Sequence, residues 1–342
     1  MSRRRALAAS VGIVLIFLAV QLGALAVVDP LKATGNQFVE DTGDPTISIV
    51  YVGAILVATG LMLAAIKLGV AGLIRAFVVL SGAYISLFVF RILLPPVVSV
   101  SVVGVSVHAL AWAGALALGG ALYLYPEWYV IDAAGILMGV GAAGLFGINF
   151  GILPALVLLV VLAIYDAISV YGTEHMLTLA SGVMEMRVPI VLVVPLSLSY
   201  SFLDAELPDP TDEGENADRT ETLAANGGAD PTTTDEEFEL DREALFIGLG
   251  DAVIPTVLVA SAGFFLRGVA TVPFPGLAVP LPAATAMAGT LAGLVVLLWM
   301  VLKGRAHAGL PLLNGGAIGG YLLGAVLAGV GLVEALGLSG LL

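Results

Sequence analysis

The sequence predicts an all-α polytopic membrane protein with nine transmembrane helices. Of the 342 residues, 59% are hydrophobic and only 11% are charged, whereas a soluble domain usually has about 25% charged residues. Many apolar windows reach the length of about 20 residues that a helix needs to cross the hydrocarbon core. A membrane β-barrel would show short alternating segments instead, and we identify no such alternation.

The apolar windows place the nine helices along the chain, separated by short polar breaks. They cover residues 6–28, 47–66, 73–94, 99–121, 130–149, 152–171, 244–266, 282–302 and 312–338. The first window follows an arginine-rich start and ends near Ala24-Leu25-Ala26. This pattern also resembles a cleavable signal peptide, so the first helix has two interpretations.

Residues 188–203 form a further apolar stretch, but it carries Pro189 and Pro195 and is too short to cross the membrane comfortably. Its residues 190–194 are rich in β-branched side chains, which favour extended structure. We therefore expect an extended or re-entrant segment there. It would lie next to any chemistry that the sixth and seventh helices carry.

The composition divides the chain into four segments. These are 1–151 with the first five helices, 152–203 with the sixth helix and the extended segment, 204–243, and 244–342 with the last three helices. The segment 204–243 has fifteen acidic residues against two arginines, so it accounts for the whole net charge of −13. A tract with so few aliphatic residues is expected to be a flexible linker.

Lysine and arginine predict the orientation, because cytoplasmic loops of membrane proteins are enriched in them. With Arg3, Arg4 and Arg5 in the cytoplasm, ten of the thirteen basic residues fall on that side. The sequence thus predicts a multi-pass protein of the cell membrane, embedded in the lipid bilayer. Its N-terminus and acidic linker would be cytoplasmic and its C-terminus external.

Several kinds of chemistry have no support in the sequence. The chain has no cysteine and three scattered histidines, so thiolate catalysis, disulfides and zinc-thiolate sites are excluded. Neither an HExxH pair nor a GxxxxGK[ST] loop is present. We therefore expect no metal, no cofactor and no nucleic-acid partner, and the sequence gives no oligomeric state.

Two aspartates lie inside apolar windows, where a carboxylate costs about 2.5–3.5 kcal/mol and needs a reason. Asp166 lies six residues before the sixth helix ends near Gly172, and Asp251 lies seven residues after the seventh begins near Ala244. Each would be about 9–10 Å below the same membrane surface. A close carboxylate pair tends to share one proton, so one member can act as a base and the other as an acid towards a peptide bond.

The neighbours of the two aspartates fit this use. Gly248 and Gly250 leave space for a second backbone beside Asp251, and Pro255 loosens the helix after it. Tyr165 places a hydroxyl next to Asp166, although a packed or interfacial aromatic is an equal alternative. Other polar residues near helix ends are interpreted as helix-end or capping residues: Asp132, Asn149, Asn314 and Glu334.

The Tyr165-Asp166 and Gly248-Leu249-Gly250-Asp251 motifs resemble the YD and GxGD signatures of the presenilin and signal peptide peptidase family. Pro311-Leu312-Leu313 is similar to the Pro-Ala-Leu motif of that family, with leucine in place of alanine. The resemblance implies nine transmembrane helices with YD on helix 6, GxGD on helix 7 and PxL at the start of helix 9. It also implies that Asp166 and Asp251 are the catalytic residues. The residues that it implies position the substrate are Tyr165, Gly248, Leu249, Gly250, Pro311, Leu312 and Leu313.

The resemblance implies an intramembrane aspartyl endopeptidase, specifically an archaeal presenilin-like homologue. Its substrates would be transmembrane-helix proteins or signal peptides, unwound locally before cleavage. We expect the 190–194 segment and a strand-like start at Pro311 to pair with the unwound substrate. Proline in place of Val191 or Val193 would then impair cleavage, and the bulkier Leu312 would narrow the site.

Three other functions remain compatible with the sequence. A prepilin-type leader peptidase also uses a GxGD-like motif, although it would not be expected to carry the PxL helix. A proton-coupled transporter or channel can use buried aspartates as a proton relay, but further polar residues along a path are scarce. A catalytically silent scaffold is the third alternative, and the presence of both aspartates argues against it.

Overall fold

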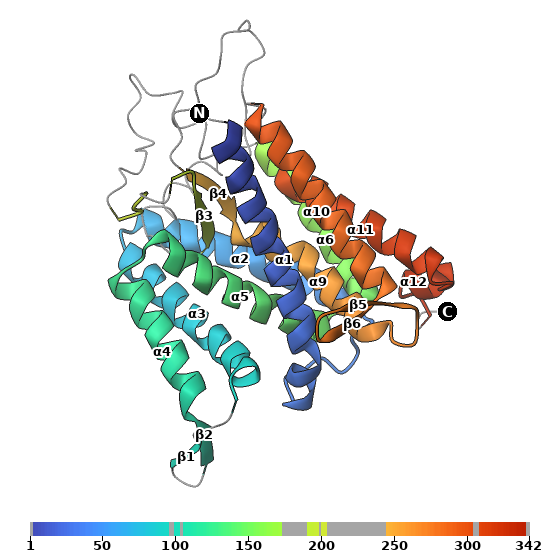
Figure 1. Ribbon diagram of the computed structural model, residues 1–342, viewed down its shortest axis with the longest axis horizontal. Coiled ribbons are helices and arrows are strands. Elements are labelled where there is room, and N and C mark those ends of the chain that lie inside the picture. Colours follow the sequence, from blue (N-terminus) through green and yellow to red (C-terminus); the bar gives the residue numbers. More distant parts are fainter. Residues whose placement is uncertain are drawn as a thin grey trace, which may run out of the picture.

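The computed structural model describes residues 3–95, 99–102, 105–172, 190–197, 200–203, 244–303 and 308–339. Within these residues the chain forms ten helices and three two-stranded antiparallel sheets (Figure 1). The helices are α1 (Arg3–Ala33), α2 (Thr46–Lys67), α3 (Ala71–Leu93), α4 (Ala109–Leu124), α5 (Trp128–Asn149), α6 (Ile152–Gly172), α9 (Leu249–Phe265), α10 (Leu281–Leu302), α11 (Gly309–Leu327) and α12 (Leu332–Ala335). The sheets pair β1 (Ser99–Val102) with β2 (Val105–His108), β3 (Val191–Pro195) with β4 (Ala244–Gly248), and β5 (Thr271–Phe274) with β6 (Leu277–Pro280).

The helices make this a mostly helical polytopic membrane protein. Among the described residues, seven helices are long and apolar enough to cross a membrane. Two more apolar helices, α4 with 16 residues and α9 with 17, are shorter than that. The predicted helical membrane fold is therefore confirmed, while the count of nine membrane crossings stays a prediction.

The predicted starts of two helices are wrong, because strands occupy these positions. Residues 99–108 of the expected helix 99–121 form the β1–β2 hairpin, in which Ser99 is paired with His108. Serine and valine alternate along both strands, and this period of two is typical of strands. Residues 244–248 of the expected helix 244–266 form β4, because they pair with β3 far away in the sequence. The predicted last helix, 312–338, is also divided, since α11 ends at Leu327 and α12 is separate.

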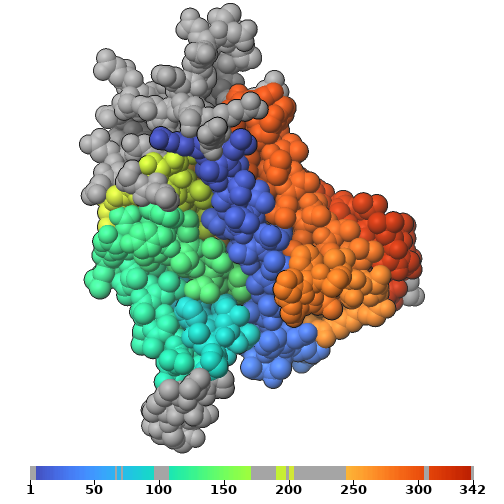
Figure 2. All heavy atoms as spheres, viewed as in Figure 1, coloured from blue at the N-terminus to red at the C-terminus, as the bar shows by residue number. Residues whose placement is uncertain are grey.

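The short helix α9 lies at the centre of the bundle. It packs against α1, α5, α6, α10 and α11, and its residues 255–262 are all buried. Figure 2 shows α1 on one face of the molecule, between α5 on one side and α10 on the other. The N-terminal half of α1 packs against the start of α9, where Phe17 shares a buried cluster with Leu249 and Ala252. Asp251 therefore begins the most enclosed helix of the fold.

Glycines allow the helices around α9 to approach each other closely. A Cβ atom on Gly289 of α10 would overlap the carbonyl oxygen of Gly316 in α11, and one on Gly316 would overlap that of Gly289. Such contacts replace the hydrophobic drive that lipid removes between membrane helices. The close packing of α11 on α10 therefore fixes the position of α11, including its start.

The predicted division into four segments keeps its status as a prediction. The acidic segment 204–243, expected to be a flexible linker, lies outside the described residues. So does 173–189, which follows α6. The predicted extended segment at 190–194 is confirmed as strand β3 (Val191–Pro195).

Candidate active site

Asp166 is held in the bundle by α11. Its side chain, on α6, is only 5% exposed, and its Oδ2 atom accepts a hydrogen bond of 3.0 Å from the backbone N–H of Leu310. Leu310 lies in the first turn of α11, where backbone N–H groups have no partner inside the helix. Farther along the two helices, the Asn314 side chain donates to the carbonyl oxygen of Leu159 at 2.9 Å. The start of α11 is therefore docked on α6 at the level of Asp166.

Asp251 lies in the first turn of α9, beside Asp166. The helices α6 and α9 pack against each other, and the two carboxylates are near enough to interact electrostatically. A Cβ atom on Gly248 would be 3.4 Å from Oδ2 of Asp251, so the end of β4 passes alongside this carboxylate. The structure brings the two aspartates together, although β4 rather than helix leads into Asp251.

The β3–β4 sheet ends at Asp251. The backbone N–H of Leu249 donates to the carbonyl oxygen of Ile190 at 2.7 Å, and the paired residues run from Val191 with Gly248 to Pro195 with Ala244. Residues alternate between bonding the partner strand and pointing away from it. Leu192 and Val194 therefore bond β4, and on β4 the backbone groups of Phe246 point to the far side of the sheet.

The other residues of the first two motifs have different surroundings. Leu249 is 9% exposed and packs towards α5, where a Cβ atom on Gly139 would be 3.5 Å from its Cδ1 atom. A Cβ atom on Gly250 would meet Ile254 at 3.9 Å, an ordinary contact distance. Tyr165 is 41% exposed and shares an outward face of α6 with Ile168. Its predicted role beside Asp166 stays a prediction.

The Pro311-Leu312-Leu313 motif lies within the first two turns of α11. The expectation of a strand-like start at Pro311 is wrong, because the helix begins two residues earlier, at Gly309. Leu313 is fully buried in the cluster that contains Leu249 and Ala252, and Leu312 packs against that cluster. The motif therefore packs against the start of α9, which carries Asp251. The expectation that Leu312 narrows the active site stays a prediction.

Two carboxylates at the start of α5 were missed as part of this region. The Oδ1 atom of Asp132 accepts a hydrogen bond of 2.7 Å from the N–H of Val193 in β3. Glu127 caps α5 and accepts hydrogen bonds from Ser201 and Phe202. Burial raises the pKa of Glu127, but these bonds and one from Trp128 outweigh it, so the pKa lies below its ordinary value. One sequence feature could have identified Asp132: like the two motif aspartates, it is a carboxylate within an apolar window.

Comparison with known proteins places this arrangement in a family. A family model described as signal-peptide peptidase, presenilin aspartyl protease matches residues 14–330. The chain belongs to this family. The match spans the segments that carry both aspartates and the whole β3–β4 sheet, and it favours the predicted protease over a prepilin-type peptidase or a transporter.

Solved structures of the presenilin family agree with that assignment. The chain is 32% identical to a presenilin family intramembrane aspartate protease solved in space group C222, over 93% of this chain and 99% of the other, with a TM-score of 0.60. A structure described in the same words in space group P2 gives 33% identity, 93% and 97% coverage and a TM-score of 0.58. No curated protein matches the sequence.

Proposed function

We propose that the protein is an intramembrane aspartyl endopeptidase in which Asp166 and Asp251 activate the water that cleaves the substrate. The observation that carries this proposal is that α6 and α9 pack together and bring two carboxylates within electrostatic reach inside an apolar bundle. Two such groups in a low dielectric favour one shared proton over two charges. Family membership supports the same chemistry.

The reaction needs only the two carboxyl groups and one water. The ionised carboxylate takes a proton from the water while the oxygen of that water attacks the scissile carbonyl carbon. The protonated partner donates its proton to the carbonyl oxygen. The resulting tetrahedral diol collapses when the C–N bond breaks and the amide nitrogen receives a proton from the pair. The Leu310 N–H fixes the orientation of Asp166 for these transfers.

The substrate must be extended at the cleaved bond, because the peptide groups of a helix are hydrogen-bonded and shielded. The far side of β4 offers backbone groups to such a strand, and β4 runs into Asp251. The helices α1 and α5 pack more extensively against β3 than any helix packs against β4. These contacts favour pairing of the substrate strand with β4 rather than with β3.

The substrate class that fits is a protein that itself crosses the membrane as a helix, including signal peptides. Such a segment reaches the aspartates without leaving the lipid bilayer, and its apolar side chains match the exposed apolar faces of the outer helices. The site lies at the same end of the bundle as the N-terminal half of α1. With the orientation predicted from lysine and arginine, the cleaved bond is near the cytoplasmic side.

Purified protein in liposomes with a fluorescent transmembrane peptide tests the function. We expect two fragments whose masses sum to that of the substrate plus one water, as measured by mass spectrometry. Proton flux, followed with a pH-sensitive dye in the same liposomes, should equal that of empty liposomes. Flux without cleavage would instead identify a transporter and overturn the proposal.

A further inference from the structure

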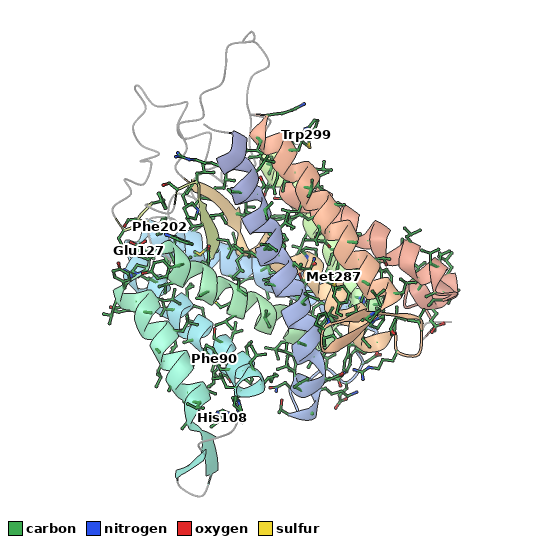
Figure 3. The ribbon with its side chains drawn as sticks, in the orientation of Figure 1. Phe90, His108, Glu127, Phe202, Met287 and Trp299 are labelled. Atoms are coloured by element: carbon green, nitrogen blue, oxygen red, sulfur yellow. The ribbon has the colours of Figure 1, made fainter. Side chains whose placement is uncertain are left out.

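Two carboxylates at the start of α5 hold the segment that contains β3, and neither belongs to a motif of the site. Asp132 is 7% exposed and Glu127 is 5% exposed. Asp132 binds the middle of the strand, through the N–H of Val193 at 2.7 Å. Glu127 binds the chain beyond the strand, through the Ser201 hydroxyl at 2.6 Å and the Phe202 N–H at 3.0 Å. Figure 3 shows Glu127 next to Phe202.

The backbone hydrogen-bond pattern of the β3–β4 sheet identifies the edge of β3 at which Asp132 lies. Because Leu249 donates to Ile190, every second residue of β3 from Ile190 onwards bonds β4. Val191, Val193 and Pro195 fall between these residues, so their backbone nitrogens face away from β4. Pro195 has no N–H, and the N–H of Val193 is taken by Asp132. From Val193 to Pro195, no N–H of β3 is available to another strand at this edge.

The helix α5 reinforces this closure. It packs directly on β3, and a Cβ atom on Gly135 would be 2.7 Å from the Cδ2 atom of Leu192. Packing alone would be satisfied by an apolar residue at position 132. A carboxylate among apolar helices is costly, and a buried N–H without a partner is costly as well. The two groups therefore satisfy each other, in the middle of the outer edge of β3.

We propose that Asp132 is a positioning residue that closes the outer edge of β3, so that an extended substrate can pair only with β4. This rests on the proposed function. A strand on β4 passes Gly248, whose backbone lies beside the Asp251 carboxylate. A strand on the outer edge of β3 would be separated from β4, which leads into Asp251, by the full width of β3. Asp132 thus selects which substrate bond reaches the aspartates.

The test compares Asp132→Leu with Asp132→Asn in liposomes, using one transmembrane peptide and recording kcat, KM and the positions of cleavage. Leucine has no acceptor, so we expect kcat/KM to fall about tenfold, the value of one lost hydrogen bond, with new cleavage positions. Asparagine keeps an acceptor oxygen and should keep the wild-type positions. Asp132→Ala, which also lacks an acceptor, should reproduce the leucine result and decides the matter if Asp132→Leu does not fold. Val193→Pro leaves this edge without an N–H, so it should keep the wild-type cleavage positions.

Unchanged cleavage positions in both Asp132→Leu and Asp132→Ala would overturn the inference, as would identical shifts in the leucine and asparagine variants. Asp251→Asn, run in parallel, separates this outcome from a failure of the proposed function. If Asp251→Asn still cleaves, the aspartyl mechanism is wrong. If Asp251→Asn is inactive and the position 132 variants behave like wild type, only the positioning role is wrong.

Discussion

Asparagine in place of Asp166 or Asp251 is expected to lower the rate of peptide cleavage by about 100- to 10,000-fold, the range that general acid–base catalysis contributes. Asparagine has nearly the shape of aspartate but can neither take a proton from water nor give one to the carbonyl oxygen. Each variant should still fold, because asparagine fills nearly the same volume and removes an ionisable group from an apolar surrounding. Thermal unfolding at or above the wild-type temperature would verify this.

The matched control for these variants is Asp29→Asn. Asp29 is an exposed residue that pairs with Arg267 at the far end of α9, and exposed ion pairs contribute little to stability. Its activity should equal that of the wild type, measured as fragments formed per enzyme in liposomes. Cleavage by Asp166→Asn or Asp251→Asn at more than about a tenth of the wild-type rate would exclude that residue from the acid–base pair.

Proline in place of Leu310 is expected to lower kcat about ten- to a hundredfold, because it removes the N–H that binds Asp166. A hydrogen bond to a charged group contributes about 1.5–3 kcal/mol. Proline is tolerated in the first turn of a helix, where the N–H has no partner within the helix. The substitution therefore removes one donor and leaves the hydrogen bonds of α11 intact.

Two control variants isolate that donor. Leu310→Ala keeps the N–H but removes the buried side chain, and Gly309→Pro introduces proline one residue earlier, at the first helical position, where it is favoured. Both should keep kcat close to that of the wild type, because both keep the N–H of residue 310. The measurement is single-turnover cleavage at saturating peptide. Equal losses in Leu310→Pro and Leu310→Ala would show that packing, and not the N–H, matters at this position.

The long apolar helices could be predicted from the sequence because lipid enforces one rule, namely that a crossing segment must be long, apolar and helical. The bounds of α5, α6 and α10 are within two residues of the windows expected. The strands β1, β2 and β4 are not covered by this rule. Residues 99–108 are apolar enough to count as part of a helix, yet they alternate between serine and valine. Residues 244–248 form a strand only because β3, about fifty residues earlier, lies beside them.

The candidate site divides in the same way. Two aspartates in apolar windows are visible in the sequence, because a carboxylate there is costly whatever surrounds it. The Leu310 N–H is not visible, since every residue except proline has one and only tertiary structure aims it at Asp166. Asp132 had the same signal as the two motif aspartates, but its place at a helix start offered an ordinary explanation. Its bond to Val193 depends on the β3–β4 register, which local sequence does not specify.

Cysteine chemistry gives the most direct measure of whether the two aspartates form a pair. The chain has no cysteine, so an Asp166→Cys/Asp251→Cys variant carries only two thiols. Asp29→Cys/Asp251→Cys is the matched control, because Asp29 pairs with Arg267 just beyond the other end of α9, about 20 Å away along the helix.

A short reagent with two thiol-reactive groups should bridge positions 166 and 251 within one chain, and the mass of the protein should increase by one bridging group. The control should take up two separate groups instead. If positions 166 and 251 are also modified only separately, the carboxylates do not meet and the aspartyl mechanism is contradicted.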